Sequence, residues 1–199
     1  ILAMEQKVIT LSRRLPDAER LAWADQLLAK MKGRRPKSRP EVYAEQARFI
    51  DENPTEKLVL QTLRICDLGI TTLPNEVYSI TGLKLKARSP FSATFNIELA
   101  NGAAGYIPPP HQHELGGYTT WPARTAGLEV DAEPKIVETL LSSLESLAGK
   151  PRRDPVPSHG AYAKAVLTEK PLAYWRCEEF KGNRLADASG NEAHGEIKG

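Results

Sequence analysis

The chain has 199 residues, of which 41% are hydrophobic and 26% are charged, as is usual for a globular protein with a sizeable core. Its net charge of +2 is too small to indicate binding to nucleic acid or to a membrane surface. No run of about 18 apolar residues predicts a transmembrane helix. The two cysteines belong to no Cys/His cluster, so a zinc finger is excluded, and Cys66 in an apolar strand pattern is expected to be buried.

The first half of the chain predicts a strand lead-in, two helices and a hairpin. Residues 1–15 alternate between polar and apolar types, which indicates a short strand or an extended lead-in. A helix is predicted over 17–32, and a second one from Pro40 to just before Asn53. The basic run between these helices is expected to be a solvated loop. Strands at 56–65 and 70–73, joined by a turn at 67–69, should pair antiparallel.

The second half adds a helix, a strand, a long loop and a strongly amphipathic helix. A helix should begin directly after Glu76, and the alternating run 92–99 predicts a third strand. The loop 101–121 carries three consecutive prolines and no regular pattern. A helix that begins at Asp131 and ends at Gly149 follows. The pattern predicts an α/β fold in which helices flank a mixed sheet.

The C-terminal part differs in composition. Prolines and exposed charges predict a linker with a short helix over 150–170, after a first domain of 1–149. Residues 171–199 combine an aromatic strand at 173–177 with a turn at 187–191, which is typical of an all-β module. No signal peptide is visible, and the chain begins at Ile1 without an initiator Met. We expect an internal fragment of a larger protein.

Three features of the sequence could carry chemistry, and each has an ordinary structural alternative. Glu76 follows a strand, at the position where ligands bind in α/β sheets. The alternative is an ordinary glutamate in the first turn of a helix, where the helix dipole stabilises its negative charge. Tyr106 and Tyr118 could stabilise an oxyanion or bind a metal, or they could simply pack. His111 and His113 could share a metal on a strand, but a solvated pair in a loop is the favoured alternative.

Two long motifs resemble a known family. They are LRICDLGITTLPNEVYSITGLKLKARSPF and ELANGAAGYIPPPHQHELGGYTTW. The stretch from Glu56 to Leu147 is similar to the C-terminal part of the neutral/alkaline ceramidase catalytic domain. The resemblance implies a zinc amidase that cleaves N-acyl-sphingosine, and a secreted or periplasmic location. It implies Glu76 and Tyr106 as zinc ligands, and Tyr118 as the group that positions and polarises the scissile carbonyl.

The chain also departs from the family pattern, which bears on the substrate more than on the metal. Asn75 replaces a glycine, Ala103 replaces a tyrosine, and Thr119 replaces an acid. The two zinc histidines of the family are expected upstream of this chain, so the isolated chain is expected to be inactive. The alternatives are a non-catalytic binding or scaffold protein with the same fold, and a hydrolase of another amide or ester.

The tail resembles a second family. Its segments Tyr174-Trp175-Arg176 and Asp187-Ala188-Ser189-Gly190-Asn191 look like the opening of a LamG/concanavalin-A-like lectin domain. The resemblance implies the start of a jelly-roll module at 171–199 that binds glycans or cell surfaces. Because only the first strands are present, no binding residue can be assigned in it.

Overall fold

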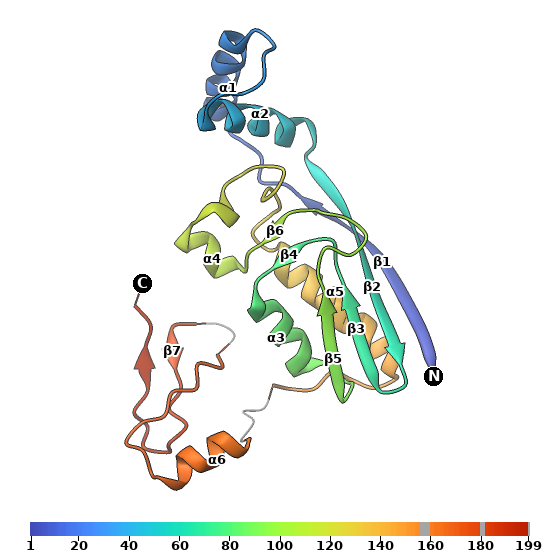
Figure 1. Cartoon of the computed structure of the whole chain (residues 1–199), viewed down its shortest axis with the longest axis vertical. Coiled ribbons are helices and arrows are strands. Elements are labelled where there is room, and N and C mark those ends of the chain that lie inside the picture. The colour runs from blue at the N-terminus through green and yellow to red at the C-terminus, as the bar shows by residue number, and fades with distance from the viewer. Residues whose placement is uncertain (156–159, 180–181, 199) are drawn as a thin grey trace. The chain divides into compact units, whose positions relative to one another are not determined.

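The computed structural model describes residues 1–155, 160–179 and 182–198 (Figure 1). It divides into two compact units, Ile1–Arg153 and Asp154–Gly199. No helix among the described residues is both long and apolar enough to cross a bilayer.

The first unit is built on a four-stranded sheet with the order β1-β2-β3-β5. These strands are β1 (Leu2–Ser12), β2 (Thr55–Ile65), β3 (Leu68–Thr72) and β5 (Ala93–Ile97). The pairs β1–β2 and β2–β3 are antiparallel, whereas β3–β5 is parallel because helix α3 (Ser79–Arg88) carries the chain back between them. The predicted α/β class and the antiparallel hairpin are both confirmed.

Two local expectations about this sheet were too simple. Strand β1 is a full 11-residue strand that pairs with β2 from end to end, so it is more than a short lead-in. The β2–β3 turn consists of Cys66 and Asp67, not of residues 67–69, and Cys66 adopts a left-handed φ of 53° there. The prediction that Cys66 is buried was therefore wrong, because the tight turn places this residue at the exposed end of the hairpin.

One face of the sheet is covered by α5 (Ala132–Ala148) and α3. The predicted amphipathic helix is confirmed, and it ends at Gly149 with a left-handed φ of 68°. The core combines side chains from the sheet, from both helices and from the segment after β3. Its fully buried members include Leu58, Leu60, Leu73, Leu85, Phe91, Ile136, Leu140, Leu141 and Leu144.

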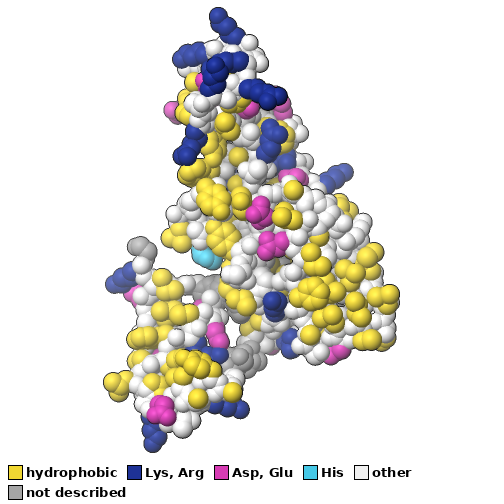
Figure 2. Space-filling model, viewed as in Figure 1, with side chains coloured by type: hydrophobic (Ala, Val, Ile, Leu, Met, Phe, Trp, Pro, Cys, Tyr) yellow, Lys and Arg dark blue, Asp and Glu magenta, His cyan; other side chains and the backbone are white. Residues whose placement is uncertain are grey.

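The opposite face of the sheet is open and apolar. The register aligns Met4, Leu63, Ile70 and Phe95 in one row across the four strands, on the face that points away from α5. Figure 2 shows hydrophobic side chains gathered over this region. Its exposed members are Leu2, Met4, Val8, Ile65, Phe95 and Ile97, with exposed fractions from 42% to 79%. Contiguous apolar patches of this kind are unusual on a soluble monomer.

The open face predicts that the isolated 199-residue chain self-associates. Phe95→Lys, which places a charge within the patch, should keep the chain monomeric over the concentration range in which the parent chain gains mass. Leu172→Lys is the matched control, because Leu172 is 90% exposed but lies in the other unit. Sedimentation velocity measures the outcome. A parent chain that stays monomeric, or a Phe95→Lys variant that associates equally, would contradict the prediction.

A helical hairpin extends the first unit between β1 and β2. It consists of α1 (Ala18–Met31) and α2 (Arg39–Glu52), close to the predicted bounds. The Asp17 side chain accepts a hydrogen bond from the Arg20 backbone N–H at 2.7 Å and so caps α1. The helices pack through small residues, including Ala24 and Ala44. Figure 1 shows the hairpin beyond one end of the sheet.

The second unit contains α6 (Ala161–Thr168) and two short antiparallel strands, β7 (Arg184–Leu185) and β8 (Gly195–Glu196). The predicted helix is confirmed. The predicted aromatic strand at 173–177 is wrong, because only Trp175 forms an isolated bridge, with Asp187. Part of the predicted linker, 156–159, lies outside the described residues. The jelly-roll assignment of this tail stays a prediction.

Candidate active site

The site is organised by two very short parallel strands, β4 (Glu76–Val77) and β6 (Tyr106–Ile107). Their register places Glu76 directly opposite Tyr106. The backbone N–H of Glu76 also donates to the carbonyl of Gly105 at 3.0 Å. Helix α3 begins only at Ser79, so the expectation of a helix directly after Glu76 was wrong. Glu76 therefore lies in a strand, and not in a first helical turn where the helix dipole would stabilise its charge.

The loop 101–121 is more regular than its sequence predicts. It contains β6, helix α4 (Pro110–Leu115) and a 3-10 turn, η1 (Tyr118–Thr120). The prediction of an irregular loop was wrong because the third proline starts a helix. Pro110 has no N–H to lose at a first helical position, and its fixed φ fits the helix.

Backbone hydrogen bonds and one buried side chain hold β6 in place. Asn75 is fully buried, and its Nδ2 donates to the carbonyl of Ala104 at 3.0 Å. The Tyr106 N–H donates to the carbonyl of Thr125 at 2.8 Å. Gly105 adopts a φ of 76° between these anchors. Asn75, noticed in the sequence only as a replacement for glycine, thus positions the backbone that carries Tyr106.

All three residues proposed from the sequence border one cavity. This cavity has a volume of about 450 Å³ and is lined by Glu76, Val77, Tyr78, Glu98, Tyr106, Gln112, Gly116, Gly117, Tyr118 and Thr119. The rings of Tyr106 and Tyr118 meet edge to face with centroids 5.4 Å apart. Tyr118 is 63% exposed, so its hydroxyl can reach a molecule that enters from solvent. Sequence reasoning missed Glu98, because it stands at the end of a strand without any motif.

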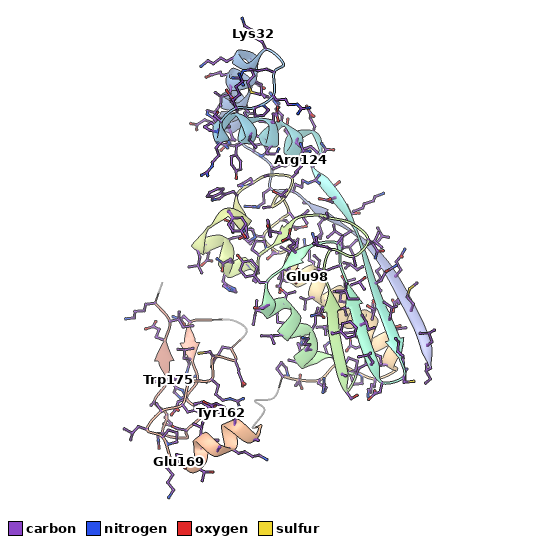
Figure 3. All side chains as sticks on the ribbon, in the orientation of Figure 1. Lys32, Glu98, Arg124, Tyr162, Glu169 and Trp175 are labelled. Atoms are coloured by element: carbon purple, nitrogen blue, oxygen red, sulfur yellow. The ribbon has the colours of Figure 1, made fainter. Side chains whose placement is uncertain are left out.

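The electrostatics of the cavity favour a cation. Two carboxylates, Glu76 and Glu98, line it, and no Lys or Arg does so within the described part of the chain. Glu98, labelled in Figure 3, also accepts a hydrogen bond from the Val77 N–H at 3.1 Å. The negative charge of Glu76, followed by the influence of Tyr118, raises the pKa of the Tyr106 phenol. A positive ion between Glu76 and Tyr106 would oppose that shift, because it stabilises the phenolate.

The two histidines are not brought to this cavity. His111 and His113 lie on α4, not on a strand. Residues that are two positions apart on a helix have side chains about 200° apart around the axis, so these two imidazoles point in nearly opposite directions. His111 is exposed. The Nδ1 of His113 is buried without a hydrogen-bond partner among the described residues, and burial, together with Arg14, lowers the pKa of its imidazole. The geometry gives no support to a metal shared by this pair.

The described residues form no group of three His, Cys, Asp or Glu side chains that could hold a metal ion. Glu76 and Tyr106 nevertheless present a carboxylate and a phenol from facing strand positions on the same cavity. Both groups are oxygen donors suited to a divalent ion, and they would complete only part of a tetrahedral ligand set. The arrangement therefore fits one side of a metal site.

The fold is similar to that of one solved neutral ceramidase. Neutral ceramidase from Pseudomonas aeruginosa matches with a TM-score of 0.50 at 11% identity, over 79% of this chain and 30% of that one. A ceramidase complexed with C2 matches with a TM-score of 0.42 at 13% identity, over 53% of this chain and 17% of that one. No protein-family model matches the chain, and no curated protein matches it by sequence. The chain thus has a ceramidase-like fold and spans under a third of the length of these proteins.

Proposed function

We propose that this chain forms part of a zinc-dependent amide hydrolase that acts on a lipid amide such as N-acyl-sphingosine. Glu76 and Tyr106 would hold the metal, and Tyr118 would act on the scissile carbonyl. The observation that carries the proposal is the placement of Glu76 opposite Tyr106 on a cavity that Tyr118 also lines. The ceramidase-like fold supports the choice of substrate class.

Each residue has a distinct task in this proposal. When bound, zinc supplies a Lewis acid and lowers the pKa of a water ligand towards about 7. The Glu76 carboxylate and the Tyr106 phenol fix the position of the ion. The Tyr118 hydroxyl donates a hydrogen bond to the carbonyl oxygen of the amide, where negative charge develops as the bond is attacked. The edge-to-face contact between the rings of Tyr118 and Tyr106 supports this role, because both residues line the same cavity.

The remaining ligands, two histidines, would come from outside these 199 residues. The isolated chain would therefore not hydrolyse amides, and the complete protein would do so in the periplasm or outside the cell. The tail from residue 171 would contribute contacts to glycans or cell surfaces. These assignments extend the resemblance in the sequence and the similarity in fold.

Removal of the Tyr118 hydroxyl tests the proposed role directly. In the complete protein, Tyr118→Phe should lower kcat for hydrolysis of an N-acyl-sphingosine by roughly 10²–10³-fold, the usual cost of losing one oxyanion donor. Zinc content and KM should change little, because the phenol acts mainly on developing charge. Tyr162→Phe is the matched control, since Tyr162 is 77% exposed and lies on α6. Unchanged kcat in Tyr118→Phe would remove Tyr118 from the mechanism.

A further inference from the structure

A second cavity lies beside the helical hairpin and has no part in the proposed chemistry. It has a volume of about 700 Å³, within the range of small-molecule sites. Its walls come from the segment that leads into α1, from the first turn of α1, from α2 and from the residues after η1. They are formed by Arg14, Leu15, Pro16, Asp17, Arg20, Arg39, Tyr43, Ala47, Ile50, Trp121 and Pro122. Most of this lining is apolar or aromatic.

The apolar wall follows one face of α2. Arg39, Tyr43, Ala47 and Ile50 recur at helical spacing, and the distance from the first to the last is about 16 Å at 1.5 Å per residue. Trp121 lies against this wall, with its ring 6.0 Å from that of Tyr43 in an edge-to-face contact. The cavity is therefore elongated enough for an extended apolar chain.

The charged part of the lining is dominated by arginine. Arg14, Arg20 and Arg39 form no ion pair with a carboxylate in the part of the chain that the structure describes, although Arg34, Arg48 and several other arginines do. Arg14 is committed to backbone carbonyls, for example by donating from Nη2 to Thr120 at 2.9 Å. The lining thus carries three guanidinium groups against a single acid.

That acid, Asp17, is already engaged. Its carboxylate accepts the Arg20 backbone N–H as the cap of α1. Arg20 and Arg39 lie in the first turns of α1 and α2, where the helix dipole disfavours a cation. These two positive charges therefore lower the stability of the two helices. No acid among the described residues offsets this cost by forming an ion pair with Arg20 or Arg39.

Arg20 and Arg39 each place the guanidinium over an indole ring. The Cζ of Arg39 lies 5.6 Å from the ring centroid of Trp121. The Cζ of Arg20 lies 3.8 Å from the ring centroid of Trp23. A guanidinium that stacks by its face keeps its N–H edge available for a carboxylate or a phosphate. Figure 2 shows Lys and Arg side chains gathered over α1 and α2.

We propose that this cavity binds an amphiphilic anion, with an acyl or alkyl chain along α2 and a carboxylate or phosphate head on Arg20 and Arg39. The apolar wall accounts for the chain, and the unpaired guanidinium groups account for the head. The turn η1 and the residue after it connect the two cavities. Tyr118 lines the candidate active site, and Trp121 lines the cavity beside the hairpin. The binding itself requires no catalysis.

Calorimetric titration of the whole chain with single-headed C12 amphiphiles tests this inference. Dodecanoate and dodecyl phosphate distinguish the two heads, and dodecanol supplies the chain without the charge. Dodecanoate and dodecyl phosphate are used below their critical micelle concentrations, and dodecanol is used below its solubility limit. The Arg20→Gln/Arg39→Gln double variant removes the proposed head site, and Arg35→Gln is the control, because Arg35 is exposed and does not line the cavity.

We expect the parent chain to bind at least one of the two anions saturably. The affinity for dodecanol, and the affinity of the double variant for that anion, should be roughly tenfold or more weaker. The affinity of Arg35→Gln for the anion should be unchanged. A preference for dodecanoate or for dodecyl phosphate identifies the head group. Equal affinity for dodecanol, equal affinity of the double variant, or no saturable binding would overturn the inference. Because the readout is binding, a failure of the hydrolase proposal would leave this result unaffected.

Discussion

Glu133→Ala is expected to lower the free energy of unfolding by about 3 to 5 kcal/mol, the usual cost of breaking a buried ion pair from one side. The Glu133 side chain is fully buried. Its Oε1 accepts hydrogen bonds from Thr81 Oγ1 and from Lys84 Nζ, both at 2.9 Å, and its Oε2 accepts from Lys84 Nζ at 3.0 Å. Truncation would leave the Lys84 ammonium, whose side chain is only 18% exposed, without its partner.

Chemical denaturation measures this effect, and two further variants show its origin. Glu129→Ala, which removes a half-buried carboxylate that pairs with the exposed Lys135 and accepts the Ser12 N–H, should cost less, about 1 to 2 kcal/mol. Glu133→Leu/Lys84→Met removes both charges and should recover much of the stability that Glu133→Ala loses. A Glu133→Ala variant as stable as Glu129→Ala would show that this pair does not join α3 to α5.

Gly105→Ala should be the most damaging small substitution near the site, at roughly 2 to 4 kcal/mol of stability. Gly105 has a φ of 76°, and an added Cβ would lie 2.3 Å from the Thr125 carbonyl oxygen. Since backbone atoms cannot swing aside, β6 would have to move. The register that sets Tyr106 opposite Glu76 would then be lost together with stability.

Gly149→Ala separates the two causes. Gly149 has a similar φ, 68°, with a ψ of 24°, and an added Cβ would meet nothing within 4 Å. It should therefore show only the backbone cost of a left-handed residue, about 1 kcal/mol. Thermal unfolding of both variants gives the comparison. Equal destabilisation would contradict the close contact between Gly105 and Thr125.

The sequence predicts the main elements of the first unit because their patterns are long. Seventeen residues with one apolar face identify α5, and alternation over β2 identifies a central strand. The strands β4 and β6 could not be found in this way, because two residues cannot show a period of two. The position of Cys66 was misjudged for a related reason, since the exact turn of a hairpin depends on register.

The candidate site could be predicted only in part from the residue types. Glu76 and Tyr106 are separated by 29 intervening residues, and only the β4–β6 pairing places them opposite each other. Their spacing alone favoured ordinary structural roles, and the family resemblance raised the metal hypothesis. Helix α4 was hidden because three prolines in a row predict an extended segment, whereas the last of them starts a helix.

The central claim is that Glu76 and Tyr106 coordinate the same divalent ion. The zinc content of the purified complete protein tests this claim most directly. Mass spectrometry for metals should find about one zinc per chain in the parent and a marked loss in both Glu76→Ala and Tyr106→Phe. Glu114→Ala, which changes an exposed carboxylate of α4, should retain the metal. Full zinc occupancy in both Glu76→Ala and Tyr106→Phe would contradict the account.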